Sequence, residues 1–165
     1  VTGASAGGIM AQYLACRTDR IAAFASVMAA LPQDLADRCQ PGRACPALLI
    51  HGTADPVIPY EGGITPSGPG RTTNFLSVEE NAAWWAENNG CITPPAEVPV
   101  PGTQERVMRI EYECPADAPV QLYKILGGGH TWPGGSSVYP EFITGPTETR
   151  LNASRTIWEF FTARQ

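Results

Sequence analysis

The sequence predicts an α/β fold in which helices flank a mostly parallel β-sheet. Residues 46–51 form a continuous apolar run, which is typical of a strand buried on both faces. Residues 9–16 carry apolar side chains on one helical face, and a second amphipathic pattern follows Asn152 near the end of the chain. The chain has 165 residues, of which 43% are hydrophobic and 16% charged, so it is long enough to bury a core. We expect one domain over residues 1–165.

The first half of the chain is expected to alternate between strands and helices. Ser77 and Glu80 match a capping box, which starts a helix that runs through Trp84 and Trp85. Asn89-Gly90 ends this helix, and we expect both tryptophans to pack in the core. The other expected elements are a strand ending at Val1-Thr2, a helix at 9–16, a strand at 21–28, a loop at 31–45, a strand at 46–51 and a long loop at 61–73.

The second half is expected to begin with a loop, because residues 93–105 are rich in proline and have no periodicity. Residues 106–112 alternate polar with apolar side chains, and residues 120–126 follow after a short connection, which predicts a hairpin at the edge of the sheet. A long loop follows at 131–149, and loops of this length are often functional. Asn152 then caps a final helix. Its expected core-facing residues are Ile157, Trp158, Phe160 and Phe161.

The segment Gly3-Ala4-Ser5-Ala6-Gly7 matches G-x-S-x-G, the pattern of a nucleophile elbow, in which a strand turns sharply into a helix and exposes a serine Oγ. The serine of such a turn has a strained backbone conformation, which is tolerated only among small neighbours. Here the neighbours are glycine and alanine, so nothing crowds the turn. Ser5 is therefore the candidate nucleophile, and the N–H of Ala6 is the candidate oxyanion donor.

A serine nucleophile needs a base and an acid, and in elbow enzymes the acid precedes the histidine along the chain. Of the two histidines, His51 ends the buried strand before any well-placed acid, so we expect it to bond to local backbone. His130 follows a strand and three glycines near the C-terminus and is the candidate base. Asp55 lies at the carboxyl edge of the predicted sheet, held extended by Pro56, and is the candidate acid. Weaker candidates by position are Asp34, Asp37 and Asp117.

Three segments carry a family resemblance. They are VTGASAGG at 1–8, HGTADPVIPY at 51–60 and GGGHTWPGG at 127–135. Together they resemble the signature blocks of the polyhydroxybutyrate depolymerase-like esterases, a group similar to the feruloyl and acetylxylan esterases. The resemblance implies an α/β-hydrolase fold and a carboxylic ester hydrolase with Ser5 as nucleophile, Asp55 as acid and His130 as base. It also makes Trp132 a candidate substrate-binding residue.

The expected substrate is an ester, either a polyester such as poly-3-hydroxybutyrate, an esterified plant polysaccharide or an aryl ester. No cofactor and no metal are expected. In this fold the elbow follows the fifth strand, so we expect the chain to be the C-terminal part of a catalytic domain that is truncated just before the elbow. The upstream strands, the second oxyanion donor and any signal peptide would then lie outside it. For the same reason we expect residues 1–165 alone to be poorly soluble and less active than a longer form.

The five cysteines lack the C-x-x-C spacing of zinc sites, which favours disulfides and an exported, extracellular protein. Cys91 and Cys114 flank a proline-rich loop and a strand, and we expect them to form a disulfide. The pairing of the other cysteines stays open. These are Cys16, Cys39 and Cys45.

Several other functions are disfavoured by the sequence. A net charge of −5 argues against nucleic acid as a partner, and no apolar run approaches the ~20 residues of a membrane span. The first seven residues also resemble the dinucleotide turn of short-chain dehydrogenases, but Ile9 stands where that motif needs glycine and no tyrosine has a lysine four residues later. A remaining alternative is an inactive hydrolase remnant that acts through protein contacts at an open strand edge. Ester turnover and size-exclusion behaviour would distinguish it from an enzyme.

Overall fold

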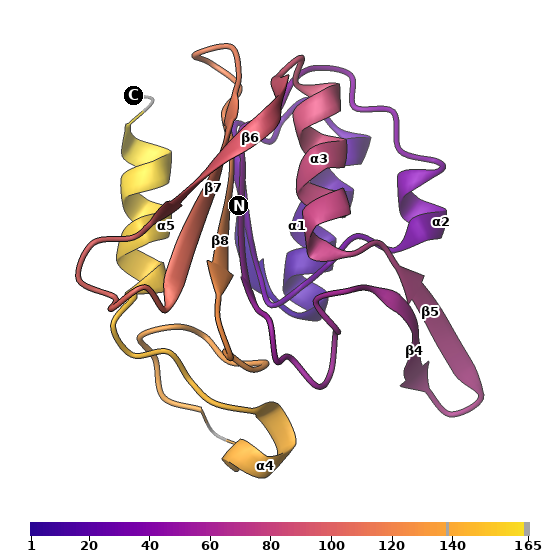
Figure 1. Cartoon of the computed structure of the whole chain (residues 1–165). Helices are drawn as coiled ribbons and strands as arrows, with labels where there is room; N and C mark the ends of the chain where they lie inside the picture. The colour runs from indigo at the N-terminus through magenta and orange to yellow at the C-terminus, as the bar shows by residue number, and fades with distance from the viewer. Residues whose placement is uncertain (138, 164–165) are drawn as a thin grey trace.

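The computed structural model describes residues 1–137 and 139–163, in which a six-stranded mixed sheet has helices on both faces (Figure 1). In their order across the sheet the strands are β1 (Thr2–Ala4), β2 (Phe24–Val27), β3 (Ala47–Gly52), β8 (Val120–Ile125), β7 (Val107–Glu113) and β6 (Ile92–Pro99). The first four run parallel, whereas β7 is antiparallel to β8 and β6 is antiparallel to β7. This architecture confirms the predicted α/β class.

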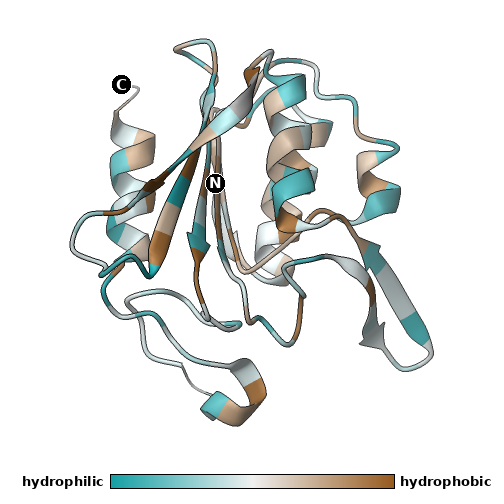
Figure 2. Ribbon diagram, in the orientation of Figure 1, coloured by the Kyte–Doolittle hydropathy of each residue, from teal (hydrophilic) through white to brown (hydrophobic). Residues whose placement is uncertain are grey.

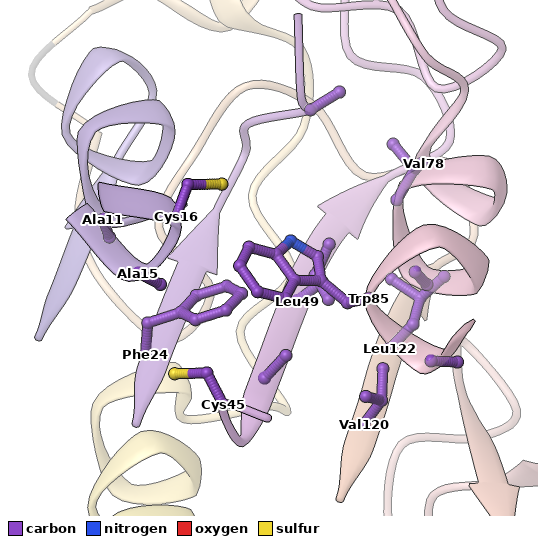
Figure 3. Packing of buried hydrophobic residues seen from close by; sticks show 14 of the residues in the cluster. Ala11, Ala15, Cys16, Phe24, Cys45, Leu49, Val78, Trp85, Val120 and Leu122 are labelled. Atoms are coloured by element: carbon purple, nitrogen blue, oxygen red, sulfur yellow. The ribbon is translucent and has the colours of Figure 1, made fainter. Parts of the chain in front are cut away.

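Each face of the sheet has its own helices and its own apolar cluster. The helices are α1 (Ala6–Arg17) and α3 (Val78–Asn88) on one face and α5 (Ala153–Thr162) on the other (Figure 1). Hydrophilic and hydrophobic positions recur along α3 and α5 (Figure 2), as expected for helices buried on one side. Successive residues of a strand point to opposite faces, so in β3 Leu49 packs with α1 and α3 while Leu48 and Ile50 pack with α5. In the first cluster the rings of Phe24 and Trp85 lie 4.7 Å apart (Figure 3).

The helix-start signals in the sequence are confirmed. The capping box at the start of α3 forms, and the Asn152 side chain accepts the N–H of Arg155 at 2.9 Å at the start of α5. Ile157 and Phe160 are buried as expected, but the expectation for Trp158 was wrong, because its side chain points away from the sheet and is 67% exposed.

Two of the predicted loops contain strands. Segment 93–105 includes most of β6, which is the edge strand, so the predicted β7–β8 hairpin forms but does not lie at the edge. The prolines of β6 are compatible with a strand there, because an edge strand has one side that needs no ladder partner. The remaining elements, which also lie in predicted loops, are the hairpin of β4 (Gly63–Gly68) and β5 (Arg71–Phe75) and the short helices α2 (Gln33–Ala36) and α4 (Glu141–Thr144).

The described residues contain two disulfides. One joins Cys91 to Cys114, the pair that the sequence predicts, and ties the start of β6 to the end of β7. The other joins Cys16 to Cys39, which the sequence left open, and Cys45 is a buried free thiol. None of the described helices combines the length and apolarity needed to cross a bilayer.

Candidate active site

Ser5 occupies the sharp turn between β1 and α1. Its backbone has φ 53° and ψ −121°, a conformation that residues other than glycine rarely adopt. The turn is held on both sides, since the Ser5 N–H donates to the Val27 carbonyl at 2.9 Å and the Ser5 carbonyl accepts the N–H groups of Gly8 and Ile9. The serine itself is half-buried, at the carboxyl end of β1.

Close packing explains why the turn needs a glycine before the serine. A Cβ on Gly3 would lie 2.3 Å from the carbonyl oxygen of Gly7, and a Cβ on Gly8 would lie 2.7 Å from Ser26 Oγ and from Ala29 Cβ. By contrast, a Cβ on Gly7 would meet no atom of the described residues within 4 Å. The two glycines of the G-x-S-x-G pattern therefore differ in their steric role here.

Asp55 follows β3 and is 5% exposed. Its Oδ1 accepts the N–H groups of Val57 at 2.8 Å and Ile58 at 2.9 Å, which closes a local turn of the kind that aspartate favours. Burial would raise the pKa of this carboxyl group, but hydrogen bonds from His130, His51 and the Ile58 N–H outweigh it and lower the pKa to about 2. Asp55 is therefore ionised at neutral pH.

His130 lies in the loop after β8, and its Nδ1 is 2.8 Å from Asp55 Oδ2. An ionised carboxylate can only accept, so Nδ1 carries the hydrogen of this bond. In the neutral ring, Nε2 is then the nitrogen with a free lone pair. Among the described residues Nε2 makes no hydrogen bond, and the side chain is 12% exposed. The pair thus offers one basic nitrogen to the site.

The loop that carries His130 is fixed by backbone hydrogen bonds to residues 144–148. The His130 N–H donates to the Thr144 carbonyl at 2.5 Å, and the Gly129 N–H donates to the Pro146 carbonyl at 2.8 Å. A Cβ on Gly129 would lie 2.1 Å from the Thr144 oxygen, so only glycine permits this approach. These bonds hold the imidazole at its place beside Asp55.

Glu148 anchors the same segment, and sequence reasoning missed it. It is 5% exposed, and its Oε1 accepts the Arg150 N–H at 2.7 Å. The guanidinium groups of Arg150 and Arg106 lie 3.5 Å and 3.8 Å from its two carboxylate oxygens. Its carbonyl accepts the N–H of Gly134 at 2.8 Å. No motif marks this residue, because its partners come from separate parts of the chain.

The three candidate residues leave the sheet at one edge, since β1, β3 and β8 are parallel to one another through their neighbours. The structure brings Asp55 and His130 into direct contact. Ser5 lies at the end of β1, with β2 between it and β3. No hydrogen bond joins Ser5 to His130 within residues 1–137 and 139–163, so the described contacts comprise the acid–base pair.

The other predicted site residues have less specific surroundings. Ala6 is the first residue of α1, so its N–H has no acceptor within the helix. Trp132 is half-buried against the cluster beneath α5, and its Nε1 donates to Ser154 Oγ at 3.1 Å. The part of the chain that the structure describes holds no group of three potential metal ligands.

His51 bonds to local backbone, as expected, with Nε2 2.9 Å from the Ile58 carbonyl oxygen. The same Nε2 lies 3.3 Å from Asp55 Oδ2, a contact that the sequence did not suggest. The acid is thus approached by imidazole rings from two different strands.

No protein-family model matches the chain. It is 36% identical over 131 residues to Feruloyl esterase B of Piromyces equi, covering 78% of this chain and 24% of that protein. It is 31% identical over 169 aligned positions to the protein named "Putative esterase NocK" of Nocardia uniformis subsp. tsuyamanensis, covering 96% of this chain and 49% of that protein. The chain therefore spans a quarter to a half of the length of these curated relatives. Over most of its own length it is similar to proteins that are named esterases.

Proposed function

We propose that the chain carries the catalytic residues of a carboxylic ester hydrolase of the α/β-hydrolase type. Ser5 is the nucleophile, His130 the base and Asp55 the acid. The observation that carries this proposal is the 2.8 Å bond between His130 Nδ1 and Asp55 Oδ2, at the sheet edge where Ser5 has an elbow conformation. The similarity to two proteins named esterases supports it.

In the proposed mechanism, His130 Nε2 takes the proton of Ser5 as Oγ attacks the ester carbonyl. Asp55 keeps the hydrogen of the imidazole on Nδ1 and stabilises the cation that forms. The free N–H of Ala6 donates to the oxyanion, and His130 then returns the proton to the departing alcohol. Water next attacks the acyl-serine, with His130 again as base, and the acid is released. All of these steps use side chains and backbone groups of the chain itself.

The substrate that we propose is an ester with apolar surface, either a polyester or a polysaccharide esterified with acyl or aromatic acids. The name of the Piromyces equi relative supports the aromatic acid. Exposed apolar side chains beside the His130 loop support an extended or aromatic substrate, because α4 carries Phe142 at 88% and Ile143 at 47% exposure and Tyr139 precedes it at 63%. We include Trp132 among the proposed substrate contacts. Parallel assays on polyhydroxybutyrate film, methyl ferulate and acetylxylan distinguish these classes.

We also propose that the protein is extracellular. Two disulfides in 165 residues support this, because such bonds persist in oxidising compartments. Detection of the protein in culture medium rather than in the cell lysate would test it.

The catalytic proposal is tested by turnover of a p-nitrophenyl ester by the complete protein. We expect Ser5→Ala to lower kcat by at least about 10³-fold without changing the melting curve. Ser67→Ala is the matched control, since Ser67 is an exposed serine of the β4–β5 hairpin. Near-parental turnover by Ser5→Ala would contradict the proposal, as would an equal loss in both variants.

A further inference from the structure

His51 is a buried titratable group that the proposed mechanism does not use. It lies in β3 with 1% exposure, and its Nε2 is 2.9 Å from the Ile58 carbonyl oxygen and 3.3 Å from Asp55 Oδ2. Its other ring nitrogen, Nδ1, is buried and has no hydrogen-bond partner among the described residues. A histidine in these surroundings has a defined protonation state, which the neighbouring atoms dictate.

Both neighbours of Nε2 are acceptors, so this nitrogen must carry a hydrogen. A second hydrogen on Nδ1 would make a buried cationic donor without a partner, which costs more than a bare nitrogen lone pair. His51 is therefore the neutral tautomer with its hydrogen on Nε2. The hydrogen is directed at the Ile58 carbonyl and shared with the carboxylate of Asp55.

The other groups around His51 leave this state undisturbed. The ring of Tyr60 meets it edge-on, with the centroids 6.0 Å apart. Burial and the neighbouring Glu79 raise the pKa of the Tyr60 hydroxyl, so it stays protonated and donates to Glu79 at 3.0 Å. Lys124, on the adjacent strand β8, bonds to Glu79 at 2.8 Å and lies over the Tyr60 ring. The nearest cation is thus paired with a carboxylate of its own.

We propose that His51 is a positioning residue for Asp55, an inference that rests on the proposed function. Asp55 Oδ1 is held by two backbone N–H groups, whereas Oδ2 receives His130 Nδ1–H from one side and His51 Nε2–H from the other. With a donor on each side, the carboxylate cannot rotate about its Cβ–Cγ bond. The bond from His51 to Ile58 closes the turn that carries the acid.

Sharing Oδ2 between two imidazoles also sets how strongly the carboxylate acts on His130. Without the His51 donor, the negative charge on Oδ2 would be directed at His130 alone and would favour the imidazolium form. The base would then stay protonated up to a higher pH. His51 therefore affects both the orientation of the acid and the pH range in which the base is free.

The test compares two substitutions of His51 in the complete protein. His51→Phe keeps the ring but removes the donor, and we expect kcat to fall by roughly 10- to 100-fold with KM unchanged, because His51 is buried and the displaced groups are catalytic. We also expect the acid limb of the kcat/KM profile to move to higher pH. His51→Gln places an amide N–H near the position of Nε2, and we expect it to restore most of kcat and the original acid limb.

Leu122→Ala is the control for loss of stability alone. Leu122 is fully buried in β8, on the face covered by α1 and α3, and makes no polar contact with the site. We expect it to lower the melting temperature without moving the acid limb. If His51→Phe kept the parental kcat and pH profile, or if His51→Gln were as impaired as His51→Phe, the positioning role would be wrong.

A spectroscopic measurement on the unaltered protein needs no variant to fold. In protein labelled with ¹⁵N-histidine, long-range ¹H–¹⁵N correlations should show His51 as a neutral ring with its hydrogen on Nε2. A hydrogen on Nδ1, or a cationic ring, at neutral pH would overturn the inference. This result is independent of Ser5, so it separates the inference from the proposed function, which fails only if Ser5→Ala retains turnover.

Discussion

His130 Nδ1 and Asp55 Oδ2 lie 2.8 Å apart although 75 residues separate them in the sequence. Their contact follows from the pairing of β3 with β8, in which Gly52 is opposite Ile125, so that both loops leave the sheet at the same level. Two further bonds tie these loops together. The Gly127 N–H donates to Thr53 Oγ1, and the Ala54 N–H donates to the Gly128 carbonyl. The acid–base pair is therefore built by the sheet itself.

Replacing Asp55 with asparagine tests the role of this pair. The amide oxygen of the new side chain can still accept the two backbone N–H groups, but its NH₂ group would face the N–H groups of both imidazoles. His130 would move its hydrogen to Nε2 and could no longer accept a proton from Ser5. We expect kcat to fall by roughly 10³–10⁴-fold while the protein still folds. Asp117→Asn, at an exposed acid, should leave ester turnover unchanged, and equal effects in the two variants would contradict the assignment.

The same aspartate should make stability depend on pH. Hydrogen bonds from the histidines outweigh burial and lower its pKa from 3.8 to about 2, so the unfolded chain binds more protons in this window. The contribution is present above pH ~4 and is lost as the pH falls through the folded-state value. At 1.36 kcal/mol per unit it is about 2 kcal/mol of unfolding free energy. Denaturant unfolding between pH 5 and pH 2 should show a shallower decline for Asp55→Asn, and parallel curves would contradict this.

The two glycines of the elbow should respond differently to alanine. Gly3→Ala forces a Cβ against the Gly7 carbonyl, and we expect a loss of about 1–3 kcal/mol in stability together with reduced ester turnover. Gly7→Ala has space within the described residues and lies in a helix, so we expect unchanged or higher stability, by up to ~1 kcal/mol. Thermal melts of both variants measure the difference. The opposite ranking would show that the packing of the turn has been misjudged.

The Cys91–Cys114 disulfide should stabilise the edge of the sheet. It closes a sequence separation of 23, for which chain entropy gives about 3 kcal/mol. We expect the double alanine variant to lose stability of this order, and peptide mass spectrometry without reduction to show the link. Cys45 should become alkylated only after unfolding, because it is buried. Free thiols at both positions in protein from an oxidising compartment would contradict the pairing.

Most of the core elements could be predicted from the sequence because their signals are local. The apolar run of β3, the capping box of α3 and the Asn152 cap each depend on a few neighbouring residues. β6 could not be predicted, because its prolines exclude an interior strand and only its position at the edge makes them acceptable. The β4–β5 hairpin was hidden in the same way, by glycine and proline in a segment whose pairing is irregular at Pro66 and Gly68.

The candidate site shows the same division. Ser5, Asp55 and His130 could be singled out by residue type and chain order, since each follows a strand that ends at one edge. The contact of His51 with Asp55 could not, because the alternation of a strand says nothing about the turn that brings the acid back toward the strand end. Glu148 was missed because its role depends on arginines from two segments.

Covalent labelling of Ser5 tests the central claim most directly. A fluorophosphonate reacts with a serine whose proton is removed by a neighbouring base, so the complete protein should gain one adduct per chain. Peptide mapping should place the adduct on Ser5, and labelling should be lost in Ser5→Ala and strongly slowed in Asp55→Asn. An adduct on another residue, or full labelling and ester turnover in Ser5→Ala, would contradict the account.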